Sequence, residues 1–216
     1  MNVDVDREKQ LAGEAAASMV EGGMRVGLGT GSTVAHLLPA LAKRKLYLRC
    51  VATSPHTEQA ARELGISVEP FTLDHLDLAI DGADQISSEG WLVKGGGAAH
   101  TREKLVAVTA ERFVVIADST KPVKTLHAPI PLELVAFGLE STLERLGQVR
   151  LRDVPRSPDG GVIADFIGAV GDPARLAARL ESTPGVVEHG LFPPEMVTTI
   201  LVGRGDSVES IEVTSR

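Results

Sequence analysis

Residues 24–43, MRVGLGTGSTVAHLLPALAK, indicate the fold class of this protein. The stretch opens with a short apolar run, passes through a glycine-rich turn, and then returns to the spacing of apolar residues that is typical of a helix. A strand, a glycine turn and a helix in this order form the beginning of an α/β unit. The order predicts further alternation of strands and helices along the chain.

The alternation continues on both sides of this stretch. Helical patterns cover 6–20, 56–65 and about 98–110, and runs that are typical of strands cover 47–53, 66–70, 76–80, 91–94 and 113–117. Strands that alternate with helices at this spacing predict an α/β fold with a mostly parallel, Rossmann-like sheet and helices on both faces. Ligands of such sheets bind at the carboxyl ends of the strands.

A different order begins at Pro129. It reads strand, helix, strand, strand, helix, strand, with helices expected at 138–147 and 172–183. This order predicts a smaller, ferredoxin-like βαββαβ lobe of the α+β type over 129–195.

Two strand-like runs near the end of the chain, 196–203 and 208–214, are interpreted as completing the first domain. The expected Rossmann-like catalytic domain then comprises 1–128 and 196–216, and 129–195 form the second lobe.

Composition and charge argue against several classes of partner. The net charge of −7 and the pI of about 5.4 disfavour nucleic acid and anionic membrane surfaces, which require clustered Lys and Arg. No apolar run approaches the roughly 20 residues that span a bilayer. The N-terminus lacks the pattern of a secretory signal, so a cytoplasmic location is expected. The single Cys50 can form no intrachain disulfide and argues against a structural zinc site.

The glycine-rich stretch 27–34, GLGTGSTV, combines backbone N–H groups at a helix N-terminus with the hydroxyls of Thr30, Ser32 and Thr33. Such a turn favours an anion site for a phosphate or a carboxylate. It lacks the lysine of a Walker A loop, and its glycines are spaced unlike those of a dinucleotide-binding turn. A tight turn with ordinary capping is the alternative.

Residues 81–84, DGAD, directly follow the predicted strand 76–80. We therefore expect Asp81 and Asp84 at the carboxyl end of that strand, where carboxylates can hydrogen-bond sugar hydroxyls or transfer protons. Ligation of Mg²⁺ and a solvated turn are alternatives that the residues alone leave open.

Residues 93–107, VKGGGAAHTREKLVA, place Lys94 before the three glycines 95–97 and Glu103 early in the following helix. Three glycines in a row indicate that the backbone approaches a ligand closely. A buried lysine can stabilise an oxyanion, and a glutamate in a closed pocket can act as a general base. A solvated first-turn acid is the alternative. His100 is interpreted as a positioning residue and is left outside the catalytic set.

Two further lysines are candidates for binding a phosphate. Lys121 lies in ADSTKPV, after the predicted strand 113–117 and at the same edge of the sheet. Lys9, in the first helix, has a similar but weaker claim. A solvated lysine is the alternative for both.

The motifs TGST, DGAD, KGGGAAxTREK and DSTK occur in this order, each at a predicted strand end. In this the chain closely resembles the type A family of ribose-5-phosphate isomerases, and the resemblance runs nearly end to end. It implies an aldose–ketose isomerase that interconverts D-ribose 5-phosphate and D-ribulose 5-phosphate in the non-oxidative branch of the pentose phosphate pathway. It also implies the absence of metal and organic cofactors, and a homodimer or homotetramer.

The resemblance assigns roles to matching positions of this sequence. Glu103 would be the proton acceptor. The chemistry of the isomerisation agrees with the residues, since Glu103 could carry a proton from C2 to C1, Lys94 could stabilise the enediolate oxygens, and Asp81 or Asp84 could assist ring opening. The expected substrate-binding residues are Thr30, Gly31, Ser32, Thr33, Asp81, Gly82, Ala83, Asp84, Lys94, Gly95, Gly96, Gly97, Lys121 and Lys9.

The sequence leaves three rival functions open: a sugar-phosphate sensor domain, a sugar-phosphate deaminase, and an isomerase of another phosphosugar. The chain shows neither a helix-turn-helix segment nor a basic patch, which argues against the sensor. His100 stands where members of the family often have Leu, and an imidazole near Glu103 could shift the pH dependence of the reaction.

Overall fold

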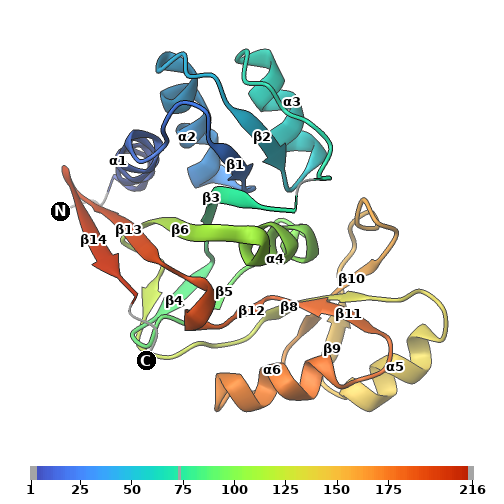
Figure 1. Ribbon diagram of the computed structural model, residues 1–216. Coiled ribbons are helices and arrows are strands. Elements are labelled where there is room, and N and C mark those ends of the chain that lie inside the picture. Colours follow the sequence, from blue (N-terminus) through green and yellow to red (C-terminus); the bar gives the residue numbers. More distant parts are fainter. Residues whose placement is uncertain (1–3, 73, 214–216) are drawn as a thin grey trace. The chain divides into compact units, whose positions relative to one another are not determined.

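The computed structural model (Figure 1) describes residues 4–72 and 74–213 and divides into two compact units. The first unit comprises Met1–Ala83, Arg102–Lys121 and Pro194–Arg216, and the second comprises Asp84–Thr101 and Pro122–Pro193. Residues 84–101, which the sequence interpretation keeps in the catalytic domain, thus belong to the second compact unit. The domain boundaries themselves stay a prediction.

A six-stranded sheet forms the centre of the first unit. From edge to edge it consists of β14 (Ser207–Glu212), β13 (Thr199–Arg204), β6 (Ala110–Asp118), β3 (Leu76–Gly82), β1 (Arg25–Leu28) and β2 (Arg49–Ala52). All neighbouring strands are parallel except the antiparallel hairpin of β13 and β14. The central strands β3 and β6 are buried over most of their length, as expected for parallel strands covered on both faces. The predicted, mostly parallel Rossmann-like sheet is confirmed.

The helices on this part of the chain are α1 (Val5–Ser18), α2 (Ser32–Lys43), α3 (Pro55–Glu63) and α4 (His100–Thr109). Local hydrogen bonds explain where two of them begin. Asp4 accepts the N–H of Arg7 at 3.1 Å at the start of α1, and Ser54 accepts that of Thr57 at 3.2 Å at the start of α3. Within the described ranges, no helix combines the length and apolar character that crossing a bilayer requires.

Helices cover both faces of the six-stranded sheet. Val26 and Leu28 in β1 belong to the hydrophobic cluster that α1 and α2 contribute to. Gly27, between them, lies against the opposite face, where a Cβ would overlap the side chain of Val106 in α4. Because successive residues of a strand point to opposite faces, α4 covers the face opposite to α1 and α2.

The second unit contains an antiparallel sheet with the strand order that the predicted βαββαβ lobe requires. From edge to edge it consists of β11 (Val186–His189), β8 (Ile130–Leu134), β10 (Val162–Phe166) and β9 (Val149–Leu151). The helices α5 (Leu139–Leu146) and α6 (Pro173–Glu181) lie on the same side of this sheet (Figure 1). Buried Leu146, Leu176 and Leu180 pack them into one cluster with the strands.

A small third sheet also belongs to the second unit. It consists of β12 (Leu191–Phe192), β5 (Leu92–Val93), β4 (Gln85–Ser87) and β7 (Pro122–Val123). Strands of two or three residues show no periodicity, so β4 and β7 are absent from the sequence prediction. The predicted strand 91–94 lies in this sheet and not in the parallel one. The predicted strand 66–70 forms only an isolated bridge between Val68 and Cys50.

Candidate active site

The loop after β1 approaches the end of β3 so closely that only glycine fits. A Cβ at Gly29 would overlap the carboxyl group of Asp81. The N–H groups of Thr30 and Gly82 donate to Asp81 Oδ1 at 2.9 and 2.7 Å. Asp81 is only 3% exposed, so these hydrogen bonds hold a buried carboxylate in a fixed orientation at the carboxyl end of β3.

Helix α2 begins with backbone N–H groups that no described side chain caps. Its N-cap residue is Gly31, whose φ of +119° suits glycine. Gly31 and Ser32 are exposed, whereas Thr33 is buried. An uncapped helix N-terminus beside hydroxyl groups favours the binding of an anion such as a phosphate. The anion site that the sequence predicts at TGST stays a prediction.

Three hydroxyl residues that the sequence interpretation does not single out surround Thr30. The Oγ1 atom of Thr30 lies 2.8 Å from Thr53 Oγ1, 2.9 Å from Ser54 Oγ and 3.3 Å from Thr57 Oγ1. These residues stand at the carboxyl end of β2 and at the start of α3. A usable signal was present, because Thr53 ends the predicted strand 47–53, Ser54 follows it directly, and β2 is the neighbour of β1.

Lys121 lies in the loop after β6, and Glu8 of α1 holds this loop. Glu8 is buried, and its carboxylate accepts the N–H of Ser119 at 2.9 Å and that of Gly205 at 2.7 Å. The first turns of α1, which also carry Lys9, are thereby attached to the loop of Lys121. Lys9 and Lys121 are both half-buried. The sequence interpretation did not identify Glu8, because both of its partners are distant along the chain.

Glu103 lies in the first turn of α4 and is 5% exposed. Carboxylates are almost never buried to this degree unless they are paired. Burial shields this carboxylate from water, and exclusion of water protects reactive intermediates in closed active sites.

In the second unit, the glycine loop contacts two side chains. The N–H of Gly96 donates to Asp84 Oδ2 at 2.8 Å, and a Cβ at Gly96 would lie 2.8 Å from Asp84 Oδ1. Gly95 has a φ of +102°, and a Cβ there would lie 2.7 Å from Nδ1 of the fully buried His100. The chain's own packing thus already requires these glycines, whereas the sequence interpretation attributed them to a ligand alone.

Lys94 directly follows β5 and is 2% exposed. Its N–H donates to the carbonyl oxygen of Gly190 at 2.8 Å. Its Nζ lies 5.4 Å from the centroid of the Phe192 ring, a cation–π contact. A buried ammonium group stabilises an oxyanion more strongly than one in water, because the surrounding dielectric is low. Neither Gly190 nor Phe192 was singled out from the sequence.

The start of α4 is attached to the sheet of the second unit. The Thr101 hydroxyl donates to Glu133 in β8, and the same carboxylate accepts from the Ser157 hydroxyl. Glu133 is buried, so these hydrogen bonds satisfy a charge that water does not reach. Thr101 stands two residues before Glu103 on one helix.

The predicted site residues are divided between the two units. The first unit holds Thr30, Gly31, Ser32, Thr33, Asp81, Gly82, Ala83, Glu103, Lys121 and Lys9, and the second holds Asp84, Lys94, Gly95, Gly96 and Gly97. Within the first unit, Thr30 and Gly82 contact Asp81. Within the second, Gly96 contacts Asp84.

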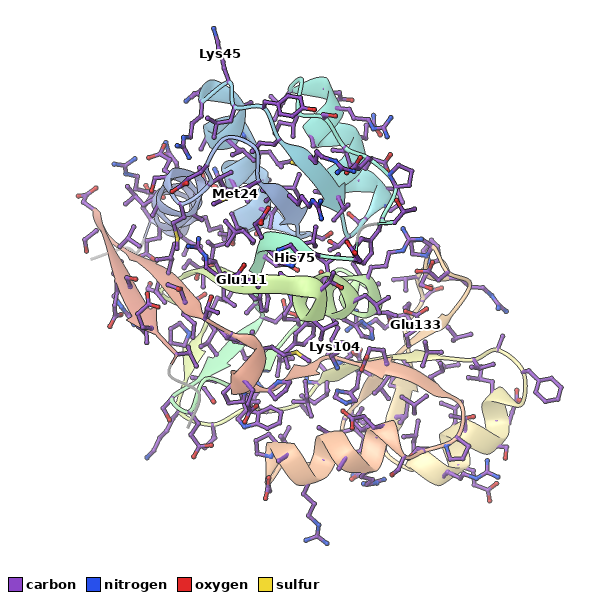
Figure 2. All side chains as sticks on the ribbon, viewed as in Figure 1. Met24, Lys45, His75, Lys104, Glu111 and Glu133 are labelled. Atoms are coloured by element: carbon purple, nitrogen blue, oxygen red, sulfur yellow. The ribbon has the colours of Figure 1, made fainter. Side chains whose placement is uncertain are left out.

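Among the described residues, the side chains of His75, Asp77 and Glu111 form a group that could hold a metal ion, with ligand atoms within 4.8 Å of one another. Figure 2 labels His75 and Glu111 of this group. They stand at the amino ends of β3 and β6, whereas Asp81 stands at the carboxyl end of β3. The predicted catalytic carboxylates are not part of this group.

Comparison with known proteins identifies relatives over nearly the whole chain. The family model for ribose 5-phosphate isomerase A (phosphoriboisomerase A) matches residues 49–207. Ribose-5-phosphate isomerase A of Caulobacter sp. strain K31 is 48% identical over 206 residues, which cover 88% of this chain and 91% of the relative. The protein of the same name from Methanosarcina acetivorans is 45% identical over 221 residues, which cover 94% of this chain and 93% of the relative.

Solved structures give the same result. Ribose 5-phosphate isomerase A from Neisseria gonorrhoeae superposes with a TM-score of 0.94 at 30% identity and covers 100% of both chains. The isomerase from Plasmodium falciparum has a TM-score of 0.91 at 30% identity and covers 97% of this chain and all of its own. A D-ribose-5-phosphate isomerase in complex with phospho-erythronic acid has a TM-score of 0.90 at 31% identity, over 98% and 100% of the two chains.

Proposed function

Because the chain belongs to the ribose 5-phosphate isomerase A family, an enzyme family, we propose that it interconverts D-ribose 5-phosphate and D-ribulose 5-phosphate through an enediolate, with Glu103 as the general base. One observation carries the residue assignment. Asp81, Lys94 and Glu103, which three separate motifs contribute, are all buried although each has an ionisable side chain.

The substrate phosphate is assigned to the loop between β1 and α2. The uncapped N-terminus of α2 supplies N–H groups, and Thr30, Ser32 and Thr33 supply hydroxyls. Lys121 would neutralise part of the phosphate charge. A relative of the chain binds phospho-erythronic acid, which is a phosphorylated sugar acid, and this supports a phosphorylated sugar as the ligand.

The proposed chemistry moves one hydrogen from C2 to C1. After Asp81 or Asp84 has assisted ring opening, the Glu103 carboxylate removes the C2 proton from the open-chain aldehyde, and the electron pair forms the C1–C2 double bond of the enediolate. Lys94 stabilises the oxygen that becomes negative. Transfer of a proton from O2 to O1, and return of a proton from Glu103 to C1, complete the ketose.

Glu103→Gln tests this assignment. The amide cannot accept the proton, so ketopentose formation should fall by about 10²–10⁴-fold, the usual contribution of a general base. The assay is ketopentose formation from ribose 5-phosphate, with and without EDTA. Glu144→Gln, the same change at an exposed glutamate of α5, is the control and should retain full activity.

Turnover that EDTA leaves unchanged and that Glu103→Gln lowers by this factor supports a metal-free enediolate route. Near-normal turnover of Glu103→Gln would remove Glu103 from the role of base. If the wild-type protein binds ribose 5-phosphate without forming ketopentose, the protein is a sugar-phosphate sensor and not an isomerase. Release of ammonia from an amino sugar phosphate would indicate a deaminase.

Three further expectations from the family are part of the proposal: a role in the non-oxidative branch of the pentose phosphate pathway, a cytoplasmic location, and a homodimer or homotetramer. Light scattering of the purified protein measures the last of these directly.

A further inference from the structure

Arg152 contacts the glycine loop of the second unit and was not singled out from the sequence. It directly follows β9, and its side chain is 16% exposed. Its Nη1 donates to the carbonyl oxygens of Gly95 at 2.9 Å and Gly96 at 3.1 Å. Its Nε and Nη2 donate to Oδ1 of Asp165 in β10 at 3.0 and 2.6 Å. One guanidinium thus connects a buried carboxylate of the sheet to the glycine loop.

The peptide group between Gly95 and Gly96 transmits this contact to Asp84. In a trans peptide the C=O and N–H groups lie in one plane and point in opposite directions. The Gly95 carbonyl accepts from Arg152, and the Gly96 N–H of the same peptide donates to Asp84 Oδ2 at 2.8 Å. Rotation of this one plane would break both interactions, so Arg152 and Asp84 fix each other through the loop.

The next peptide group is oriented in the same way. The carbonyl of Gly96 accepts from Arg152, so the N–H of Gly97 points away from the guanidinium. No described residue accepts a hydrogen bond from this N–H, which leaves it available to an oxygen of the substrate.

The loop needs such a contact because its own sequence does not define its conformation. Consecutive glycines populate many backbone states, and this loop also contains Ala98 at a φ of +59°. Arginine suits the task better than lysine. Its planar fork can donate to a carboxylate and to two carbonyls at once, whereas an ammonium group is a compact charge at the end of a flexible chain.

We propose that Arg152 is a positioning residue of the active site, whose guanidinium fixes the Gly95–Gly97 loop and through it Asp84. The inference rests on the proposed function, since it assumes that Asp84 and the loop bind the sugar phosphate. It adds a residue outside the four motifs and assigns the Arg152–Asp165 ion pair a role in turnover rather than in stability alone.

Arg152→Lys is the first test. It keeps the charge beside Asp165 and removes the fork, so the loop should lose its fixed orientation. We expect kcat/KM for ribose 5-phosphate to fall by about 100-fold, the scale of a misplacement of about 1 Å in an active site. In the same variant, the amides of Gly96 and Gly97 should exchange with solvent faster, while the melting temperature changes little. Hydrogen exchange by mass spectrometry measures the loop directly.

Arg150→Gln is the matched control. Nη2 of Arg150 lies 3.8 Å from Oδ2 of the same Asp165, yet the Arg150 side chain is 67% exposed. Its substitution should leave both kcat/KM and loop exchange unchanged.

The double variant Arg152→Gln/Asp165→Asn covers the case in which Arg152→Lys folds poorly, because it leaves no unpaired buried charge. It should fold and show the same kinetic loss. Wild-type kcat, KM and loop exchange in Arg152→Lys would overturn the proposal. Loss of folding in both variants would overturn it as well, since the pair would then support the whole lobe. If the wild-type protein has no isomerase activity, the proposed function fails, and loop exchange still decides whether Arg152 orders the loop.

Discussion

Glu8 illustrates how a single buried side chain can determine the place of a loop. Burial raises the pKa of its carboxyl, but hydrogen bonds from Ser119 and Gly205 and the charge of Arg204 outweigh this effect, so that the pKa in the folded protein lies below its ordinary value. The ionised carboxylate is therefore the form that the fold favours. It connects α1 with the loop that carries Lys121.

The lowered pKa of Glu8 predicts a pH dependence of stability. A group whose pKa is lower in the folded state stabilises the protein above its unfolded pKa, about 4.3 for Glu, and this contribution is lost as the pH falls through the folded pKa. Glu8→Gln should therefore unfold at lower urea concentration than the wild type at about pH 7, and the difference should shrink below about pH 4. Urea unfolding across this range is the measurement. A difference that is constant with pH would contradict the charge-based account.

At the scale of elements, Gly190, the residue before β12, holds the backbone of Lys94. The Lys94 N–H donates to Gly190 at 2.8 Å, and the Gly190 N–H donates to Pro131 at 2.8 Å. A Cβ at Gly190 would overlap the Lys94 carbonyl oxygen and lie 2.9 Å from Pro131 Cδ. Backbone packs on backbone here, so a side chain cannot be accommodated by a rotamer change.

Gly190→Ala should consequently destabilise the protein by about 1–3 kcal/mol, the usual cost of overpacking a tight site. It should also lower kcat, because Lys94 must shift with its backbone. Thermal unfolding and steady-state kinetics test the two effects. Gly22→Ala is a suitable control, because a Cβ at Gly22 would lie 3.9 Å from its nearest neighbour, Cδ2 of Leu46. Unchanged stability and turnover in Gly190→Ala would show that the strand pair adapts.

For the molecule as a whole, Cys50 offers a probe of unfolding. It lies fully buried in the cluster formed by the helices and the six-stranded sheet. Burial, with a smaller contribution from the charge of Glu69, raises the pKa of its thiol to about 12. The thiolate that reacts with thiol reagents is thus nearly absent in the folded protein at neutral pH.

We expect native protein to react negligibly with a disulfide reagent at about pH 8, the ordinary pKa of a free thiol being about 8.5. Labelling should follow the global unfolding curve in guanidinium chloride and should not precede it. Rapid labelling of the native protein would mean that the region around Cys50 opens locally.

The sequence alone was sufficient for the fold class, because that depends on local periodicity. The apolar runs of β1, β3 and β6, the helical spacing of α1 to α3, and the strand and helix order of the second lobe are all legible within short windows. The candidate motifs could be located for the same reason, since ligands of α/β sheets bind where strands end. The short strands β4 and β7 could not be predicted from the sequence, because two or three residues show no periodicity.

Only the tertiary structure decided which side chains contact the motifs. Thr30 meets Asp81 across 51 residues of sequence, Arg152 meets Gly95 across 57, and Glu8 meets Gly205 across 197. Local patterns record whether a residue is buried and in which kind of element. They do not record partners at such separations, because a hydrogen bond depends on where the packed sheets place its donor and acceptor. The sequence therefore determined the class, the elements and the motifs, and the packing determined the contacts that orient them.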